Sequence, residues 1–193
     1  ELRGVGNLLG YEQHGHIDVV GYDTYVRLLD EAIREVKGEK KEETVNETAV
    51  DINVNAYIDK EYIENESTRI ELYKRIVALG SKEEAEDIVD ELIDRFGDVP
   101  EETHNLIRIA LLRKMANDIK IKSIERKSRQ MVITFGDMNP DVFRRMGKLT
   151  VPFKGRFLFD AGVKPSLVLK MQDKNEKVIL DELENLIRLL HDD

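Results

Sequence analysis

The chain has 193 residues, of which 41% are hydrophobic and 36% charged, and its formal net charge is -9. This balance is typical of a folded, water-soluble protein, and no apolar run approaches the roughly 20 residues of a membrane span, so we expect a cytoplasmic protein. The absence of cysteine excludes disulfides and cysteine-ligated zinc, and the negative charge means that any contact with nucleic acid must be local.

Residues 1–38 contain two different patterns. Five glycines among the first 21 residues predict a loop with tight turns. From Tyr22 to Val36 the apolar side chains recur at helical spacing, and Gly38 supplies a stop. The chain begins at Glu1 within the loop, so we expect a piece of a longer protein.

The clearest boundary is a charged stretch at residues 39–48, which has almost no apolar anchors and is typical of a solvated linker. We therefore predict a loop and helix at 1–38, a linker at 39–48 and a compact domain at 49–193.

The strands of the compact domain follow from alternation and from turn signals. Apolar and polar residues alternate over 50–56, which predicts a half-buried strand. Residues 121–126 and 131–135 are typical of a hairpin, and residues 156–160 and 166–171 of a second pair. Because strands and helices come in clusters, we predict an α+β fold with a small, mainly antiparallel sheet packed against several helices.

Three helices are predicted between the first strand and the hairpin. The first ends at Gly80, and the second runs from Ser81 to Phe96 with Ser81 and Glu84 in capping-box spacing. The third begins at Pro100, a favoured first helical position. Two further helices are expected, a short one from 139 and a C-terminal one over 179–190.

Catalytic and cofactor motifs are missing. The glycine-rich segment 4–10 lacks the lysine and Ser/Thr of a phosphate-binding loop and fails the dinucleotide fingerprint. His14 and His16 supply at most half of a zinc site, and no segment resembles a nucleophile elbow. We therefore predict no catalytic residue, no metal and no cofactor in this chain.

The predicted helix from Ser81 to Phe96 carries seven acidic residues outside its apolar stripe. Such a run is usually only a solvated face, and this interpretation stays open. Glu91 and Asp94, however, are three residues apart and therefore project from neighbouring positions, where carboxylates can bind arginines of a partner.

A basic cluster provides an alternative of a different class. Five cations surround the predicted hairpin, and they favour a nucleic-acid-binding accessory domain. They are Lys120, Lys122, Arg126, Lys127 and Arg129.

Three sequence blocks carry a resemblance to a known family. Residues 3–17 read Arg-Gly-Val-Gly-Asn-Leu-Leu-Gly-Tyr-Glu-Gln-His-Gly-His-Ile, a block shared with the RecG branch-migration helicase. Residues 65–76 read Asn-Glu-Ser-Thr-Arg-Ile-Glu-Leu-Tyr-Lys-Arg-Ile, and residues 90–100 read Asp-Glu-Leu-Ile-Asp-Arg-Phe-Gly-Asp-Val-Pro. Together the blocks resemble the C-terminal region of the bacterial transcription-repair coupling factor family.

The resemblance implies a role in a larger motor. Family members move along double-stranded DNA with ATP and Mg, which bind elsewhere in the protein, and Arg3 and Gln13 match their translocation motif. The family's C-terminal domain docks onto a UvrB-like N-terminal module, which covers the surface that recruits UvrA and represses the motor until RNA polymerase is engaged. Glu91 and Asp94 match acidic residues that face arginines of that module. The resemblance therefore implies an autoinhibitory interaction domain.

Overall fold

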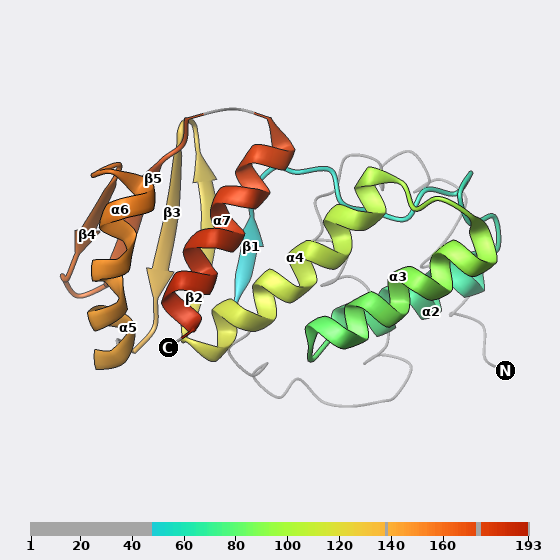
Figure 1. Cartoon of the computed structure of the whole chain (residues 1–193), viewed down its shortest axis with the longest axis horizontal. Helices are drawn as coiled ribbons and strands as arrows, with labels where there is room; N and C mark the ends of the chain where they lie inside the picture. The colour runs from blue at the N-terminus through green and yellow to red at the C-terminus, as the bar shows by residue number, and fades with distance from the viewer. Residues whose placement is uncertain (1–47, 138, 173–174, 193) are drawn as a thin grey trace, which may run out of the picture.

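The computed structural model describes residues 48–137, 139–172 and 175–192. They form a five-stranded sheet with helices packed against it, and further helices extend beyond one end of the sheet (Figure 1). This confirms the predicted α+β class. Within these residues, no helix is both long and apolar enough to cross a membrane.

The sheet is mixed but mainly antiparallel. Its strands have the spatial order β1-β2-β3-β5-β4; β1 is parallel to β2 and the other neighbours are antiparallel. Both predicted hairpins, β2–β3 and β4–β5, are confirmed. The strand bounds are Ala49–Asp51 (β1), Ile121–Lys127 (β2), Gln130–Phe135 (β3), Phe157–Asp160 (β4) and Ser166–Lys170 (β5).

The five predicted helices are present, together with two short ones that the sequence did not predict. The two extra helices have only four residues each, too few to show a period of 3.6. The bounds are Glu66–Val77 (α2), Lys82–Phe96 (α3), Glu101–Asp118 (α4), Pro140–Arg145 (α5), Met146–Leu149 (the 3-10 helix η2), Thr150–Phe153 (α6) and Glu176–His191 (α7). Pro100 is the cap that precedes α4 rather than its first helical residue.

One continuous core joins the sheet to the helices. Helix α7 buries most of its leucines, among them Leu183 and Leu186, and the sheet contributes Ile124, Ile133 and Leu167. Helix α4 packs beside α7 and is buried on most sides, so it has no single apolar stripe. In Figure 1, α2 and α3 lie at the end of α4 that projects away from the strands.

The predicted strand at 50–56 is wrong beyond Asp51. At Asn53 the backbone has a φ of +52°, and the chain leaves the sheet edge there. Residues farther along are held on α4 instead, because Asn105 Nδ2 donates to the Asn55 carbonyl at 3.1 Å and Thr103 Oγ1 to the Tyr57 carbonyl at 3.1 Å. The alternating pattern therefore records alternate burial and not strand pairing.

Thr48, which the sequence assigned to the linker, is buried in the fold. Its side chain donates a 2.6 Å hydrogen bond to the carbonyl of Ile121 at the start of β2. The rest of the proposed loop, helix and linker, residues 1–47, lies outside the described residues, so the three-part division remains a prediction.

Candidate functional site

Helix α3 is fixed at both ends by short-range contacts. The Ser81 hydroxyl accepts from the N–H of Glu84 at 3.2 Å, as the capping-box spacing predicted. The Glu84 carboxylate accepts from the N–H of Gly80 at 2.8 Å, one residue before the cap. At the other end, Gly97 has a φ of +84° and its N–H binds the Ile93 carbonyl at 3.0 Å. The helix therefore holds its side chains at set positions.

The apolar residues of α3 are buried to different degrees, with Val89 and Phe96 only partly covered. Ala85, Ile88 and Leu92 are buried, as expected. Ile93, which the helical period placed on the same face, is 46% exposed. It lies at the edge of the apolar stripe, three residues after Asp90, so an apolar side chain borders the acidic surface.

Four of the acidic residues form a line on the side of α3 opposite its buried face. Glu83, Asp87, Asp90 and Asp94 follow one another at spacings of four, three and four residues, and all four are exposed. We call these four residues the acidic stripe. Of these four residues only Asp94 was predicted to lie at an interface, although the spacing of all four is visible in the sequence.

Glu91 has a different environment, on the flank of α3 that faces α2. Its Oε2 lies 2.7 Å from Arg75 Nη1 on α2, and its Oε1 accepts from Arg95. The hydrogen bond from Arg75, assisted by the one from Arg95, holds the pKa of Glu91 below its ordinary range. Glu91 is therefore already used within the domain, while its side chain keeps 28% exposure.

Asp94 has no such partner in the described part of the chain. Among those residues, no cation lies within ion-pair distance of its carboxylate, which is exposed in the last turn of α3. Glu91 and Asp94 thus lie one turn apart, as predicted, but they face different surroundings.

One charge of α3 is unfavourable for the helix itself, although Glu83 and Glu84 in the first turn are favourable. The carbonyl end of a helix is negative, so acidic side chains in the last turns are unfavourable there. Asp94 occupies the last turn, where Arg95 is the only basic residue. Local violations of this kind are expected at functional surfaces, because function and not stability maintains them.

One of the five cations around the β2–β3 hairpin, Lys127, is paired with a carboxylate on its own strand. Lys127 Nζ lies 3.0 Å from Glu125 Oε2, and this hydrogen bond is the main cause that lowers the pKa of Glu125. Lys122 is exposed on β2, and Lys120 adopts a φ of +61° where α4 leads into the strand. The cations therefore do not form an uninterrupted basic face.

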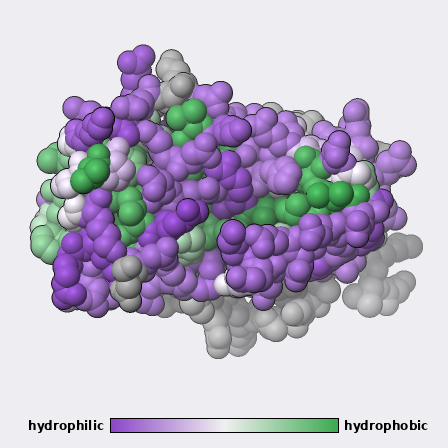
Figure 2. Space-filling view, in the orientation of Figure 1, coloured by the Kyte–Doolittle hydropathy of each residue, from purple (hydrophilic) through white to green (hydrophobic). Residues whose placement is uncertain are grey.

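The predicted translocation-motif residues Arg3 and Gln13 lie outside the described residues, so their role stays a prediction. Figure 2 shows that hydrophilic residues cover most of the viewed face, with a hydrophobic band where α3 lies near α4.

Comparisons with known proteins agree on one family. Residues 52–146 match the model of the TRCF domain. A transcription-repair-coupling factor of Staphylococcus haemolyticus is 37% identical over 192 residues, which cover 98% of this chain and 16% of that protein. One from Staphylococcus aureus strain USA300 is 44% identical over 129 residues, which cover 66% of this chain and 11% of the relative. The chain thus spans less than a fifth of the length of these relatives.

A solved structure gives the same assignment at the level of the fold. The crystal structure of the C-terminal domain of transcription-repair coupling factor superposes with a TM-score of 0.63 at 25% identity, covering 75% of this chain and 91% of that one. The chain therefore belongs to the transcription-repair-coupling factor family and corresponds to its C-terminal part.

Proposed function

We propose that this chain is the autoinhibitory latch of its parent motor and that the acidic stripe, with Glu91 beside it, docks onto arginines of the parent's UvrB-like N-terminal module. The observation that supports the proposal most strongly is the line of exposed carboxylates on α3, one of which, Asp94, has no ion-pair partner in the described chain. An arginine binds a carboxylate through two parallel hydrogen bonds, so such a line favours arginine-rich partners.

The two predicted interface residues have different tasks in this proposal. Asp94 offers its carboxylate to the partner. Glu91 fixes the angle of α3 through Arg75 and contributes to the interface only from its remaining exposed edge. Ile93 adds an apolar contact next to Asp94, as polar interfaces usually combine charged pairs with an apolar anchor.

The docking free energy expected for such a latch is suited to a reversible switch between two states. Two or three arginine–carboxylate pairs at a partly exposed interface contribute about 1 to 3 kcal/mol, which shifts a two-state equilibrium by about five- to 150-fold. Docking of this strength holds a resting state and still yields when another ligand binds the open state better.

The parent protein supplies the remaining activities. In this proposal it is an ATP-dependent translocase on double-stranded DNA that displaces stalled RNA polymerase and recruits UvrA for nucleotide excision repair. ATP and Mg bind in the motor lobes of the parent, and Arg3 and Gln13 take part in its translocation motif. This chain is not itself an enzyme.

The direct test measures the binding of this chain to the isolated UvrB-like module of the same protein. Isothermal titration calorimetry gives the affinity at low and at raised salt. We expect Asp94→Lys to weaken binding by about tenfold or more, because it places a cation opposite an arginine. Asp137→Lys makes the same charge change at an exposed position that follows β3, outside α3, and is expected to leave the affinity unchanged. Equal affinities for the two variants would show that the acidic stripe does not take part in docking.

A further inference from the structure

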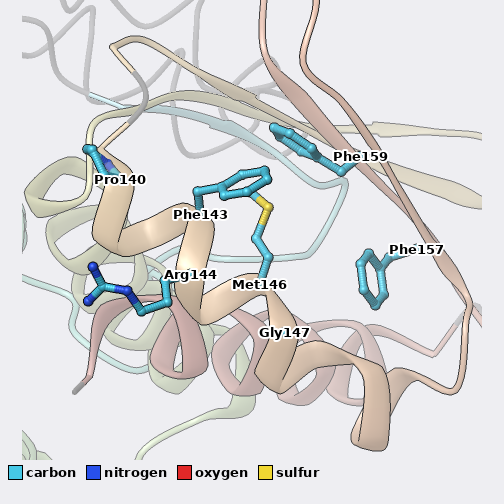
Figure 3. Close-up of a pocket in the computed structure, with 7 residues that line it drawn as sticks. All are labelled: Pro140, Phe143, Arg144, Met146, Gly147, Phe157 and Phe159. Atoms are coloured by element: carbon cyan, nitrogen blue, oxygen red, sulfur yellow. The ribbon is translucent and has the colours of Figure 1, made fainter.

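A groove lined by aromatic side chains lies between α5 and the edge strand β4, in a part of the domain distant from α3 (Figure 1). Its volume is about 630 Å³. Figure 3 shows Phe143 and Met146 reaching from the helical side toward Phe159 on the strand, while Arg144 points away from the rings. The lining residues are Pro140, Phe143, Arg144, Met146, Gly147, Phe157 and Phe159.

Phe143 and Phe159 pack against each other in the groove, but Phe143 is incompletely covered. Phe143 meets Phe159 edge-on, with ring centroids 5.7 Å apart, and Phe159 meets the buried Phe135 at 6.5 Å. Phe143 nevertheless keeps 57% exposure. A large aromatic side chain held in place at the surface is typical of an interface anchor, because it offers apolar area at low entropic cost.

The edge of β4 adds unpaired backbone groups beside the same groove. Lys170 N donates to the Arg156 carbonyl at 2.9 Å, and Leu158 pairs with Val168 in the antiparallel register. In such a ladder the residues that bond to the neighbouring strand alternate with residues that point outward. The N–H and C=O groups of Phe157 and Phe159 therefore face the free edge, where no strand of the described chain pairs with them.

The surroundings of the groove are basic, in contrast to the chain as a whole. Residues 139–172 contain seven Lys or Arg and two Asp, whereas the whole chain has a net charge of -9. Two of the seven cations already bind α7, because Arg156 pairs with Glu182 at 2.8 Å and Arg145 donates to the His191 carbonyl at 2.8 Å. Arg144 lines the groove and, among the described residues, forms an ion pair only with the exposed Asp141 at 3.1 Å. Lys154 and Lys164 are exposed on either side of β4 in sequence, without an ion-pair partner in the same part of the chain. The local charge therefore attracts an acidic ligand.

From these features we propose that the groove and the free edge of β4 together bind an extended acidic segment of a partner protein. The segment adds as a strand to β4 through the outward groups of Phe157 and Phe159. Two apolar side chains at alternate positions enter the groove beside Phe143, and flanking Asp or Glu residues meet Arg144 and Lys154. A peptide matches both the donors and the acceptors of the edge, whereas a nucleic acid offers acceptors to the cations but no regular partner for a strand edge.

The test uses the whole 193-residue chain and a fluorescein-labelled nonapeptide, Glu-Asp-Glu-Leu-Thr-Leu-Glu-Asp-Glu. We expect binding by fluorescence anisotropy with a dissociation constant on the order of 10 to 100 µM, which corresponds to about -5.5 to -7 kcal/mol. In two-dimensional 15N–1H NMR spectra, the amide signals of Phe157 and Phe159 are expected to shift most.

Matched variants separate the groove from the rest of the surface. Phe143→Ser removes the exposed ring and is expected to weaken peptide binding by at least about tenfold, in line with loss of an interface anchor. Leu158→Ser changes a side chain that is 70% exposed on the opposite face of β4 and is expected to leave the affinity unchanged. If Phe143→Ser lowers the melting temperature, the double charge reversal Arg144→Glu with Lys154→Glu replaces it, with the same expected loss.

Modified probes test the chemistry of the ligand. A peptide N-methylated at its central threonine and both leucines loses the backbone donors that strand addition needs and is expected to bind at least about tenfold more weakly. The proposal is overturned if the acidic peptide does not bind, or if Phe143→Ser binds it as tightly as the unsubstituted 193-residue chain does. It is also overturned if a lysine-flanked analogue of the peptide binds equally well. Tighter binding of an oligothymidine, lost in the charge-reversal variant, would overturn it in favour of a nucleic-acid site.

Discussion

Arg75 on α2 and Glu91 on α3 form an ion pair in which Nη1 lies 2.7 Å from Oε2. The pair joins two consecutive helices at the end of the domain that lies away from the sheet (Figure 1). Because Arg95 donates to the other oxygen of the same carboxylate, Glu91 is held between two cations. The contact therefore adds a polar link between α2 and α3 to the buried packing of Ala85, Ile88 and Leu92.

A double-mutant cycle on Arg75→Ala and Glu91→Ala measures the contact. The side chains are 40% and 28% exposed, so we expect a coupling free energy of only about 0.5 to 1 kcal/mol in urea unfolding. The pair Lys82–Glu86 within α3 is more exposed, at 78% and 63%, and serves as the control with a coupling of about 0.3 kcal/mol. Additive effects of Arg75→Ala and Glu91→Ala would show that the pair does not hold α3.

The lowered pKa of Glu91 predicts how the free energy of unfolding changes in acid. The pKa of Glu91 in the folded chain is lowered from its ordinary value of 4.5, mainly by Arg75. Its contribution to the free energy of unfolding is therefore complete above pH 4.5 and is lost as the pH falls through the lowered pKa. We expect the Glu91→Gln variant to have a lower free energy of unfolding than the unsubstituted chain at neutral pH. In acid the two free energies are expected to become equal. A constant difference in urea midpoints down the titration would contradict the assignment.

The ends of α3 could be predicted from the sequence, whereas the use of its carboxylates could not. Ser81 and Gly97 mark the helix ends through chemistry that involves only neighbouring residues. Whether Glu91 or Asp94 is paired depends on where α2 crosses α3, a relationship between residues far apart in the chain. Ile93 illustrates the same limit, because a helical period identifies a face but does not show how far the neighbouring helices cover it.

Strands show a related limit. The hairpin formed by β2 and β3 was predicted because alternation and turn signals coincide there. The alternation after Asp51 was equally regular, yet its residues pack alternately against the core without a neighbouring strand in the described chain. The groove beside Phe143 was not predicted at all, since it depends on α5 lying over an edge strand that comes later in the chain.

The latch predicts a phenotype in the whole parent protein. Asp90→Ala with Asp94→Ala removes two carboxylates of the acidic stripe without touching the Arg75 contact. We expect basal ATP hydrolysis to rise about fivefold or more and UvrA binding to become detectable without RNA polymerase, because docking of about 1 kcal/mol or more is lost. Asp137→Ala, at an exposed position outside α3, is the charge control. Unchanged hydrolysis and UvrA affinity in the double variant would mean that the acidic stripe does not restrain the motor.

A second polar contact joins α4, against which α3 packs, to α7. Arg108 on α4 binds Glu184 on α7 through two bonds, Nε to Oε1 at 2.7 Å and Nη2 to Oε2 at 3.0 Å. Asp181 accepts a third bond from the same guanidinium at 2.6 Å. Because paired bonds in a partly buried site are stronger than surface pairs, we expect Glu184→Ala to lower the free energy of unfolding by about 1 to 2 kcal/mol.

The matched control for Glu184→Ala is the same substitution at an exposed helical glutamate. Glu71 lies within α2 and its side chain is exposed, so Glu71→Ala should change the free energy of unfolding by less than about 0.5 kcal/mol. Because both variants replace a helical glutamate by alanine, the difference between them reports the contact with Arg108 and not a change in helix propensity. Equal urea midpoints for the two variants would show that the α4–α7 contact rests on its apolar residues alone.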